Sequence, residues 1–166
     1  MELFVRDACL EDAAAIVAIF NPIIAARTYT AFDTEFTVDA EEAYLRSFPA
    51  RGIFHVAVDR ANQRVLGFQS LEPFATFTRA FDHVGTLGTF VELACRRQGV
   101  ATALFTSTFD VARRKGYEKL HTFVRGDNPA ALAVYLRHGF EIVGTARRHA
   151  KVNGVYVDEI IIERFL

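Results

Sequence analysis

The sequence predicts an α/β fold in which a mixed sheet lies between helices. Apolar residues recur at helical spacing in four segments and form short runs typical of strands in seven others, and the two kinds of segment alternate along the chain. The chain has 166 residues, of which 51% are hydrophobic, enough to build one large core. Because no internal repeat, linker or low-complexity segment interrupts it, we expect a single domain spanning 1–166.

In the first half of the chain the expected order is strand, helix, helix and three strands. Residues 3–6 predict a strand and residues 10–20 a helix that Asn21-Pro22 ends, because proline has no backbone N–H to donate. A second helix is expected over residues 38–48, with Thr37 or Asp39 as its cap. Residues 54–59 and 65–71 predict a hairpin. Residues 84–94 predict a strand that its glycines allow to bulge or to splay from a neighbour.

In the second half, two helices alternate with a strand before a final hairpin. One helix is expected from Gly99 to about residue 115, with Gly116 after it, and residues 120–124 predict the strand that follows. Asn128-Pro129 opens the next helix, which Gly139 closes. Residues 140–145 and 155–165 flank Asn153-Gly154, the two-residue turn most typical of a β-hairpin.

The turn before the third predicted helix has the composition of an anion-binding loop. Gly99 and Ala101, spaced by one residue, allow a ligand to approach the backbone closely. The first-turn amides of a helix have no intrahelical partner, so a phosphate group can accept hydrogen bonds from them at the positive end of the helix dipole. Arg96 and Arg97 add positive charge beside these amides. An ordinary glycine turn next to two solvated arginines is the alternative.

The overall charge excludes some classes of partner. A net charge of −1 argues against a nucleic-acid surface or a patch for anionic membranes as the main function, so we expect neither a nucleic-acid nor a membrane partner. Cys9 and Cys95 lie far apart, match no metal-ligand spacing and suit a reducing compartment, which predicts neither a disulfide nor a metal site. The first residues lack the features of a signal peptide, so the expected location is cytoplasmic.

Two motifs and the strand before them resemble the GNAT superfamily of N-acetyltransferases. Arg96-x-x-Gly99-x-Ala101 matches its Q/R-x-x-G-x-G/A element. Asn128, followed seven residues later by Tyr135 and then by Gly139-Phe140, matches its second signature. Within the superfamily, residues 19–36 and 79–82 resemble the phosphinothricin acetyltransferase-like branch. The resemblance implies a mixed, mostly antiparallel sheet of about seven strands, splayed at its central strands, with four helices on both faces.

This resemblance implies a set of residues that bind acetyl-CoA. Relatives hold its diphosphate on the loop and helix start, and its pantetheine arm along the preceding strand. The cofactor-binding residues implied here are Thr89, Val91, Leu93, Arg96, Arg97, Gln98, Gly99, Val100, Ala101, Thr102, Asn128 and Tyr135. The main-chain amide of Val91 would face the acetyl oxygen and polarise it. Asn128 has a second interpretation as the cap of the helix that starts at Pro129.

Transfer of an acetyl group to an amine also needs an acid and a base. Tyr135 has the position of the superfamily's general acid, and a phenol with a pKa near ~10 is well matched to a departing thiolate; a half-buried core tyrosine is the alternative. Relatives in the phosphinothricin branch carry a glutamate where this chain has Thr86, which cannot act as a base. Glu92, Glu72, Asp82, His83 and an ordered water are the alternatives, although strand alternation turns Glu92 away from Val91.

The acceptor is expected to be a small amine with an apolar side chain, such as an amino acid or an analogue. Arg79 suits a substrate carboxylate because its planar fork binds two oxygens, and we expect Phe32, Phe74 and His83 to line the same pocket. Many relatives are dimers, so a homodimer is expected. Two other functions stay open: a non-catalytic acetyl-CoA sensor, which the absent carboxylate at Thr86 would suit, and acetylation of protein N-termini.

Overall fold

A computed structural model describes residues 2–166, and the mostly antiparallel α/β sheet predicted above is confirmed. The seven strands are β1 (Leu3–Asp7), β2 (Ile53–Asp59), β3 (Arg64–Pro73), β4 (Val84–Val91), β5 (Lys119–Arg125), β6 (Glu141–Val152) and β7 (Val155–Phe165). The four α-helices are α1 (Ala13–Ala25), α2 (Val38–Arg46), α3 (Val100–Arg114) and α4 (Pro129–Arg137). Short 3₁₀ turns occur at Leu10–Asp12, Arg79–Phe81 and Leu93–Cys95.

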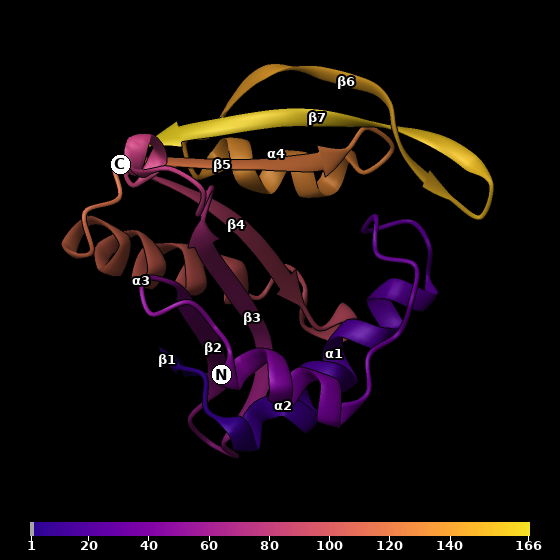
Figure 1. The fold of residues 1–166 in the computed structure, drawn as a ribbon. Helices are drawn as coiled ribbons and strands as arrows, with labels where there is room; N and C mark the ends of the chain where they lie inside the picture. The colour runs from indigo at the N-terminus through magenta and orange to yellow at the C-terminus, as the bar shows by residue number, and fades with distance from the viewer. Residues whose placement is uncertain (1) are drawn as a thin grey trace.

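The sheet is divided into two parts at its centre. Its strand order is β1-β2-β3-β4-β5-β7-β6, and every neighbouring pair is antiparallel except β4 and β5. The parallel pair extends only from Val84 opposite Lys119 to Thr86 opposite His121. Beyond Thr86, β4 stays paired with β3 as far as Val91, and β5 stays paired with β7 as far as Arg125. The two strands therefore splay apart, as predicted, and leave a V-shaped split (Figure 1).

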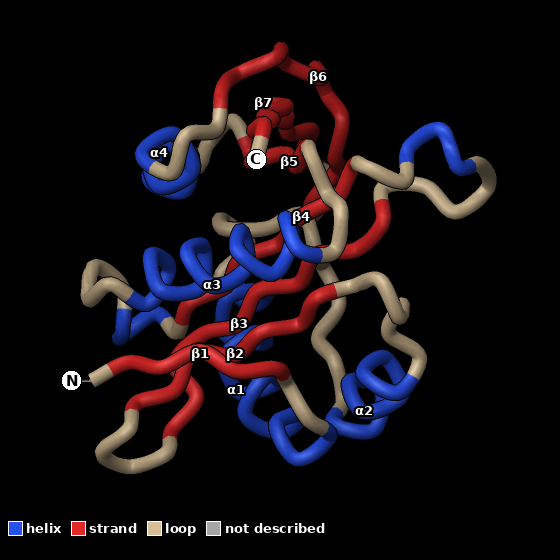
Figure 2. The backbone as a smooth tube through the Cα atoms, turned by 90° about the vertical axis from the view of Figure 1, so that its left-hand side faces the viewer, coloured by secondary structure: helices blue, strands red, loops and turns tan. Residues whose placement is uncertain are grey.

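Helices cover both faces of the sheet. Figure 2 shows α3 on one face of β1–β4 and α1 and α2 on the other. The α4 helix packs beside β5 and reaches α3 through aromatic rings, because Phe105 lies 5.3 Å from Tyr135 between ring centroids. A second apolar cluster, centred on Phe20 and Phe68, fills the space between α1 and the sheet. Within residues 2–166, no helix covers the α1 side of the part of the sheet formed by β5, β7 and β6 (Figure 1).

The α1 helix continues through the Asn21-Pro22 pair that was expected to end it. The turn after Pro22 carries Ile23 and Ile24, which are both fully buried against the sheet. Burial of an isoleucine side chain contributes about 1.5–3 kcal/mol, so two of them offset the roughly 3 kcal/mol cost of proline inside a helix. The Asn21 side chain also bonds the backbone of Phe36 twice, at 2.9 Å each, which fixes the chain that returns toward α2.

The strand expected over residues 84–94 ends earlier, at Val91. The amide of Glu92 makes the last bond of the ladder to Leu66 O at 2.9 Å, and Leu93 then enters a 3₁₀ turn. The strand position expected for Leu93 is therefore wrong. The final hairpin is confirmed, with Asn153 and Gly154 at φ values of 50° and 78°, although β6 is longer than the predicted residues 140–145.

Candidate active site

The edge of β4 that faces the split carries unpaired amide positions. Antiparallel strands direct successive N–H groups alternately toward and away from the partner. The amide of Glu92 bonds β3, so the amides of Thr89 and Val91 point to the opposite side, from which β5 has departed. The backbone therefore lines the split with donors, and changing the Val91 side chain would not remove them.

The loop at the wide end of the split has the geometry of an anion site. Gly99 lies in the left-handed region at φ +85° and caps α3, and a methyl group added there would meet no atom within 4 Å. The first intrahelical bond of α3 runs from Ala103 N to Gly99 O at 3.0 Å. The backbone amides just before Ala103, those of Val100, Ala101 and Thr102, donate no hydrogen bond within residues 2–166. These three donors are free to bind an anion at the helix N-terminus.

The charged residues of this loop differ in how they are held. The Arg96 guanidinium lies over the ring of Tyr29, 4.0 Å from its centroid, which fixes it by a cation–π contact. Arg97 is exposed and has a φ of 61°, and the Gln98 side chain donates to Ala94 O at 3.1 Å. Arg96 is therefore the cation whose position the fold defines, and Arg97 extends into solvent.

The split is crossed at its mouth by the loop between α1 and α2. In addition to stacking on Arg96, Tyr29 accepts a bond from the Asn128 side chain through its carbonyl oxygen at 3.3 Å. Asn128 also caps α4, because its side-chain oxygen accepts from Ala131 N at 3.2 Å. The predicted capping role of Asn128 is confirmed. The same amide group joins the α1–α2 loop to the start of α4.

Tyr135 lies beside the split with its hydroxyl directed at β4. Its side chain is buried, and the phenol donates to Thr89 Oγ1 at 3.2 Å. Gln69 Nε2 donates to the same oxygen at 2.7 Å. Burial raises the pKa of Tyr135 above its usual value, although the contact with Thr89 opposes this shift. The phenol therefore stays protonated at neutral pH, which is the state that a general acid needs.

The carboxylate of Glu92 is not placed for catalysis. It forms an ion pair with Arg64 at 2.8 Å and accepts a hydrogen bond from Cys95 Sγ at 3.2 Å, beyond the end of β4. Both partners hold it at the edge of β3, so the geometry gives no support to Glu92 as the base. Asp82 is paired with Arg51 and Arg79, at 3.7 Å and 3.4 Å, outside the split.

The four residues expected in the acceptor pocket do not form one cluster. Phe32 packs on Phe20 of α1, whereas Phe74 follows β3 and lies 5.4 Å from His121 between ring centroids. The Arg79 side chain is 97% exposed. His83 is exposed before β4 and contributes its carbonyl oxygen to Glu118 N and Lys119 N. The two aromatic residues lie on the α1 side of the sheet, where an acceptor can approach. The geometry gives no such support to Arg79 and His83.

A polar row that the sequence does not reveal lies at the closed end of the split. Glu72, Thr86 and His121 are direct neighbours across β3, β4 and β5, so their side chains share one face. Tyr44 of α2 donates a hydrogen bond to the Glu72 carboxylate. The side-chain order in this row depends on strand register. A pattern of polar and apolar residues does not specify that register before the strands are paired.

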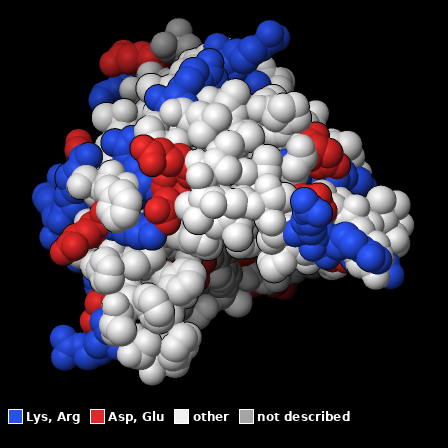
Figure 3. Space-filling model, turned by 90° about the horizontal axis from the view of Figure 1, so that it is seen from above, with Lys and Arg blue, Asp and Glu red and all other residues white. Residues whose placement is uncertain are grey.

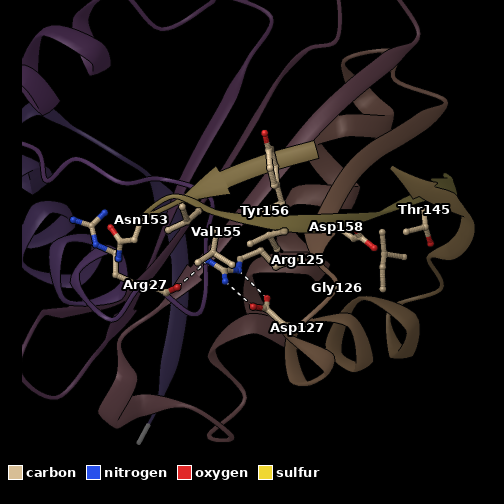
Figure 4. Close-up of a pocket in the computed structure, with 12 residues that line it drawn as sticks. Arg27, Arg125, Gly126, Asp127, Thr145, Asn153, Val155, Tyr156 and Asp158 are labelled. Carbon is tan, nitrogen blue, oxygen red and sulfur yellow. Dashed lines mark hydrogen bonds and ion pairs between the residues drawn. The ribbon is translucent and has the colours of Figure 1, made fainter. Parts of the chain in front are cut away.

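An open pocket of about 710 Å³ lies near the tip of the β6–β7 hairpin (Figure 4). Its central group is Arg125, which bonds Asp127 at 2.7 and 2.8 Å and the carbonyl oxygens of Arg27 and Thr30 at 2.9 and 3.0 Å. These bonds join the end of β5 to the α1–α2 loop. Arg125 therefore holds this loop in place. Because these bonds occupy its guanidinium group, Arg125 does not offer the pocket a free cation for a ligand.

In the part of the chain that the structure describes, residues 2–166, no group of three or more His, Cys, Asp or Glu side chains is arranged to hold a metal ion. The helices described there all lack the length or the apolar run that crossing a membrane requires.

Residues 23–140 match the acetyltransferase (GNAT) family. The chain is 28% identical to a phosphinothricin N-acetyltransferase of Streptomyces coelicolor over 166 residues, which cover 98% of this chain and 96% of that protein. It is 34% identical to an L-amino acid N-acetyltransferase of Escherichia coli over 83 residues, 49% of this chain and 51% of that one.

Solved structures agree with the sequence relatives. A GCN5-related N-acetyltransferase from Kribbella flavida superimposes with a TM-score of 0.85 at 30% identity, covering 99% of this chain and 98% of that chain. A phosphinothricin acetyltransferase from Sinorhizobium meliloti, solved in complex with AcCoA, has the same fold with a TM-score of 0.90 at 19% identity, covering 100% and 89%. The chain belongs to the acetyltransferase (GNAT) family and is an acyl-CoA-dependent N-acetyltransferase.

Proposed function

We propose that this protein transfers the acetyl group of acetyl-CoA directly to the primary amine of a small molecule, an amino acid or an analogue of one. The observation that carries the proposal is the free amide set at Val100, Ala101 and Thr102, placed at the mouth of a split whose inner wall carries Tyr135. The names of the relatives support the acceptor class, since they acetylate phosphinothricin or L-amino acids.

The diphosphate of acetyl-CoA would bind at the start of α3. The free amides supply hydrogen bonds, and Arg96, held by Tyr29, supplies a charge-assisted contact. Arg97, Gln98, Gly99 and Asn128 complete this part of the site by position. The pantetheine arm would then follow the edge of β4, where Thr89 and Val91 present their amides and Leu93 flanks the entrance.

In the reaction, acetyl-CoA supplies a thioester whose carbonyl carbon the amine attacks. The Val91 amide would donate to the carbonyl oxygen as negative charge develops on it. The C–N bond forms as the C–S bond breaks, and the departing sulfur takes the proton of the Tyr135 phenol, while the nitrogen loses one proton. Thr89 would hold the phenol at the split by accepting its hydrogen bond, and Gln69 donates to the same Thr89 oxygen and so fixes that acceptor.

We further propose that two copies of this single domain, 1–166, form a homodimer in the cytoplasm. Exposed apolar side chains along β6 and β7 support the dimer: Ile142, Val143, Val155 and Tyr156 are each at least half exposed. Figure 3 views the molecule from the β6 side and shows a broad area without charged side chains. Both cysteines are free, which supports a reducing compartment. Light scattering behind gel filtration measures the subunit number directly.

Two experiments test the activity itself. Calorimetry with acetyl-CoA should show saturable binding, because the loop presents free donors for a diphosphate. Mass spectrometry of pooled amines and amino acids incubated with enzyme and acetyl-CoA should reveal products heavier by one acetyl group, with apolar amino acids among them. Binding without any acetylated product would favour a sensor, and modification of peptide N-termini alone would favour a protein N-terminal acetyltransferase.

A further inference from the structure

We propose that Glu72 replaces the carboxylate that Thr86 lacks: it binds the acceptor's ammonium group over Thr86 and accepts its proton. This inference rests on the proposed function, because it assigns the base for that reaction. It arises from the neighbours of Thr86 in the sheet, which bring a carboxylate to the same place from another strand.

Strand register places Glu72 next to the missing group. Glu72 of β3 lies directly opposite Thr86 of β4, in an antiparallel ladder without a register shift. Directly opposed residues share a face and have Cβ atoms about 4.5–5.5 Å apart. The Glu72 side chain therefore lies on the same face as the short side chain of Thr86 and next to it. A glutamate at position 86 would put its carboxylate in the same region.

This position lies at the closed end of the split. Thr86 is the last residue of β4 that pairs with β5, and the open edge of β4 with its free amides begins immediately after it. The face shared by Glu72 and Thr86 is the α1–α2 side, opposite to the side on which Tyr135 and α3 pack. An amine that enters from this face meets the carboxylate before it reaches the thioester.

The Glu72 carboxylate is held in position by Tyr44. The phenol of Tyr44 donates to Glu72 Oε1, and the Tyr44 ring is itself fixed between Phe48 and Phe54, at 5.5 and 6.1 Å between centroids. Burial raises the pKa of Tyr44, and the nearby Glu72 raises it further, so the phenol stays a donor over the working pH range. Oε2 of Glu72 has no hydrogen bond within residues 2–166 and is available to an ammonium group.

The other titratable groups around this position do not compete for the proton. His121, on the far side of Thr86, has its pKa lowered by burial and a buried Nδ1 without a partner among the described residues. Protonation would leave that N–H unsatisfied, so the imidazole stays neutral. Glu41, which lies near Tyr44 on α2, is only 5% exposed, so an incoming amine does not reach it; the same burial raises the pKa of its carboxyl group. Glu163, the next residue of the row, is paired with Lys119.

The proton balance of the step is complete. The ammonium N–H bond breaks as its proton moves to Glu72 Oε2, directly or through one water, and the nitrogen keeps the electron pair that attacks the thioester carbon. Glu72 then returns this proton to solvent. The second nitrogen proton passes to solvent as the amide forms, the thiolate takes the proton of Tyr135, and solvent then reprotonates the phenolate. The net reaction releases one proton for each ammonium acetylated.

The test is a pH profile of kcat/KM for Glu72→Gln. The wild type should be nearly independent of the amine's ionisation in the neutral range, because the protein removes the proton. The variant should lose at least about 100-fold in kcat/KM at neutral pH, and its rate should rise about tenfold per pH unit toward the pKa of the amine. Glu42→Gln, on the exposed side of α2, is the matched control and should behave as the wild type.

A rescue separates chemistry from structure. Adding Thr86→Glu to Glu72→Gln returns a carboxylate to the same face and should restore at least tenfold in kcat/KM together with the flat profile. Tyr44→Phe should change the pH profile less than Glu72→Gln, since it removes only the positioning contact.

The outcomes distinguish this inference from the proposed function. Full activity and an unchanged profile in Glu72→Gln, with acetyl-CoA binding intact by calorimetry, would overturn the inference and leave the function standing. A lost activity that Thr86→Glu does not restore in part would also count against it, because the defect would then not be the missing carboxylate. A wild type that acetylates no amine would overturn the function itself.

Discussion

The phenol of Tyr135 and the hydroxyl of Thr89 lie 3.2 Å apart, and this contact joins α4 to β4 next to the split between the central strands. The Thr89 oxygen also accepts from Gln69, whose side chain is fully buried on β3. Residues of α4, β4 and β3 therefore together determine the position of the hydroxyl proton of Tyr135. In the proposed mechanism this hydroxyl would protonate a sulfur that leaves along β4, and burial, which raises the pKa of Tyr135, favours the protonated phenol.

Replacing Tyr135 with phenylalanine should remove the acid and leave the binding site. We expect kcat to fall about 100-fold to 10,000-fold for Tyr135→Phe. The affinity for acetyl-CoA should change little, since the diphosphate is proposed to bind the free amides at the start of α3. Steady-state kinetics and calorimetry measure the two quantities separately.

Tyr117 provides the matched control for this change. It is also a buried tyrosine, and its hydroxyl donates to Arg51 O at 3.0 Å, away from the split. Tyr117→Phe should lower the free energy of unfolding by about 1 kcal/mol without lowering kcat. Equal losses of kcat in both variants would mean that Tyr135 acts only through stability.

Much of the fold could be predicted because local signals agree with the final packing. Thr37 caps α2 by accepting from Ala40 N, Asn128 caps α4, and Asn153-Gly154 forms the hairpin turn. The motif around Gly99 is similarly local, since its glycine is required by a positive φ at one position. These features depend on a few consecutive residues, and the sequence contains them directly.

The remaining differences come from contacts between distant residues. The α1 helix passes Pro22 because Ile23 and Ile24 bury against the sheet, and no local pattern states how much burial is available there. Glu72 meets Thr86 only after β3 and β4 pair in one register. The loop motif at Gly99 was therefore accessible to sequence reasoning, whereas the sequence offered Glu72 only as one of several candidate bases and did not show its position beside Thr86.

A second prediction concerns the loop glycine. Gly99→Ala should weaken acetyl-CoA binding, because the added methyl group stands in open space within 4 Å of Gly99, at the loop where the diphosphate is proposed to approach the backbone. Alanine at φ +85° should also cost about 1–2 kcal/mol of stability. Chemical denaturation and calorimetry measure the two effects.

Gly116→Ala separates the effect on binding from the effect on stability. Gly116 has nearly the same φ, +84°, and equally open surroundings, but it lies at the other end of α3. Gly116→Ala should lose similar stability and keep its affinity for acetyl-CoA. If Gly99→Ala bound acetyl-CoA as tightly as Gly116→Ala does, the anion site would not be at this loop.

A third prediction concerns the loop that crosses the split. Arg125 holds it through the carbonyl oxygens of Arg27 and Thr30, so Arg125→Gln should leave buried acceptors unsatisfied and cost about 1–3 kcal/mol. The loop should then become the first site of limited proteolysis. Asp127→Asn removes the ion pair with Arg125 but keeps both carbonyl contacts, and it should protect the loop as the wild type does. Identical cleavage rates in all three proteins would contradict this role for Arg125.

The last prediction follows from a buried histidine on β2. His55 is only 4% exposed, with Nδ1 at 2.8 Å from Thr108 Oγ1. Burial lowers its pKa below the usual value. The carboxylate of Asp7 opposes this shift, while Lys115 and Arg114 add to it. The unfolded chain therefore takes up a proton near pH ~6.5, before the folded protein does.

Because the unfolded state binds more protons in that range, the stability from neutral His55 is complete above pH ~6.5 and is lost as the pH falls toward the lowered pKa of the folded state. In urea denaturation measured from pH 7.5 down to pH 5, His55→Gln should make the decline less steep by up to about 1.4 kcal/mol per pH unit. Thr108→Val removes the hydrogen-bond partner without removing the titrating group. It should lower stability at every pH while keeping the wild-type decline, and a flattened decline in that variant would assign the effect to the contact rather than to the imidazole.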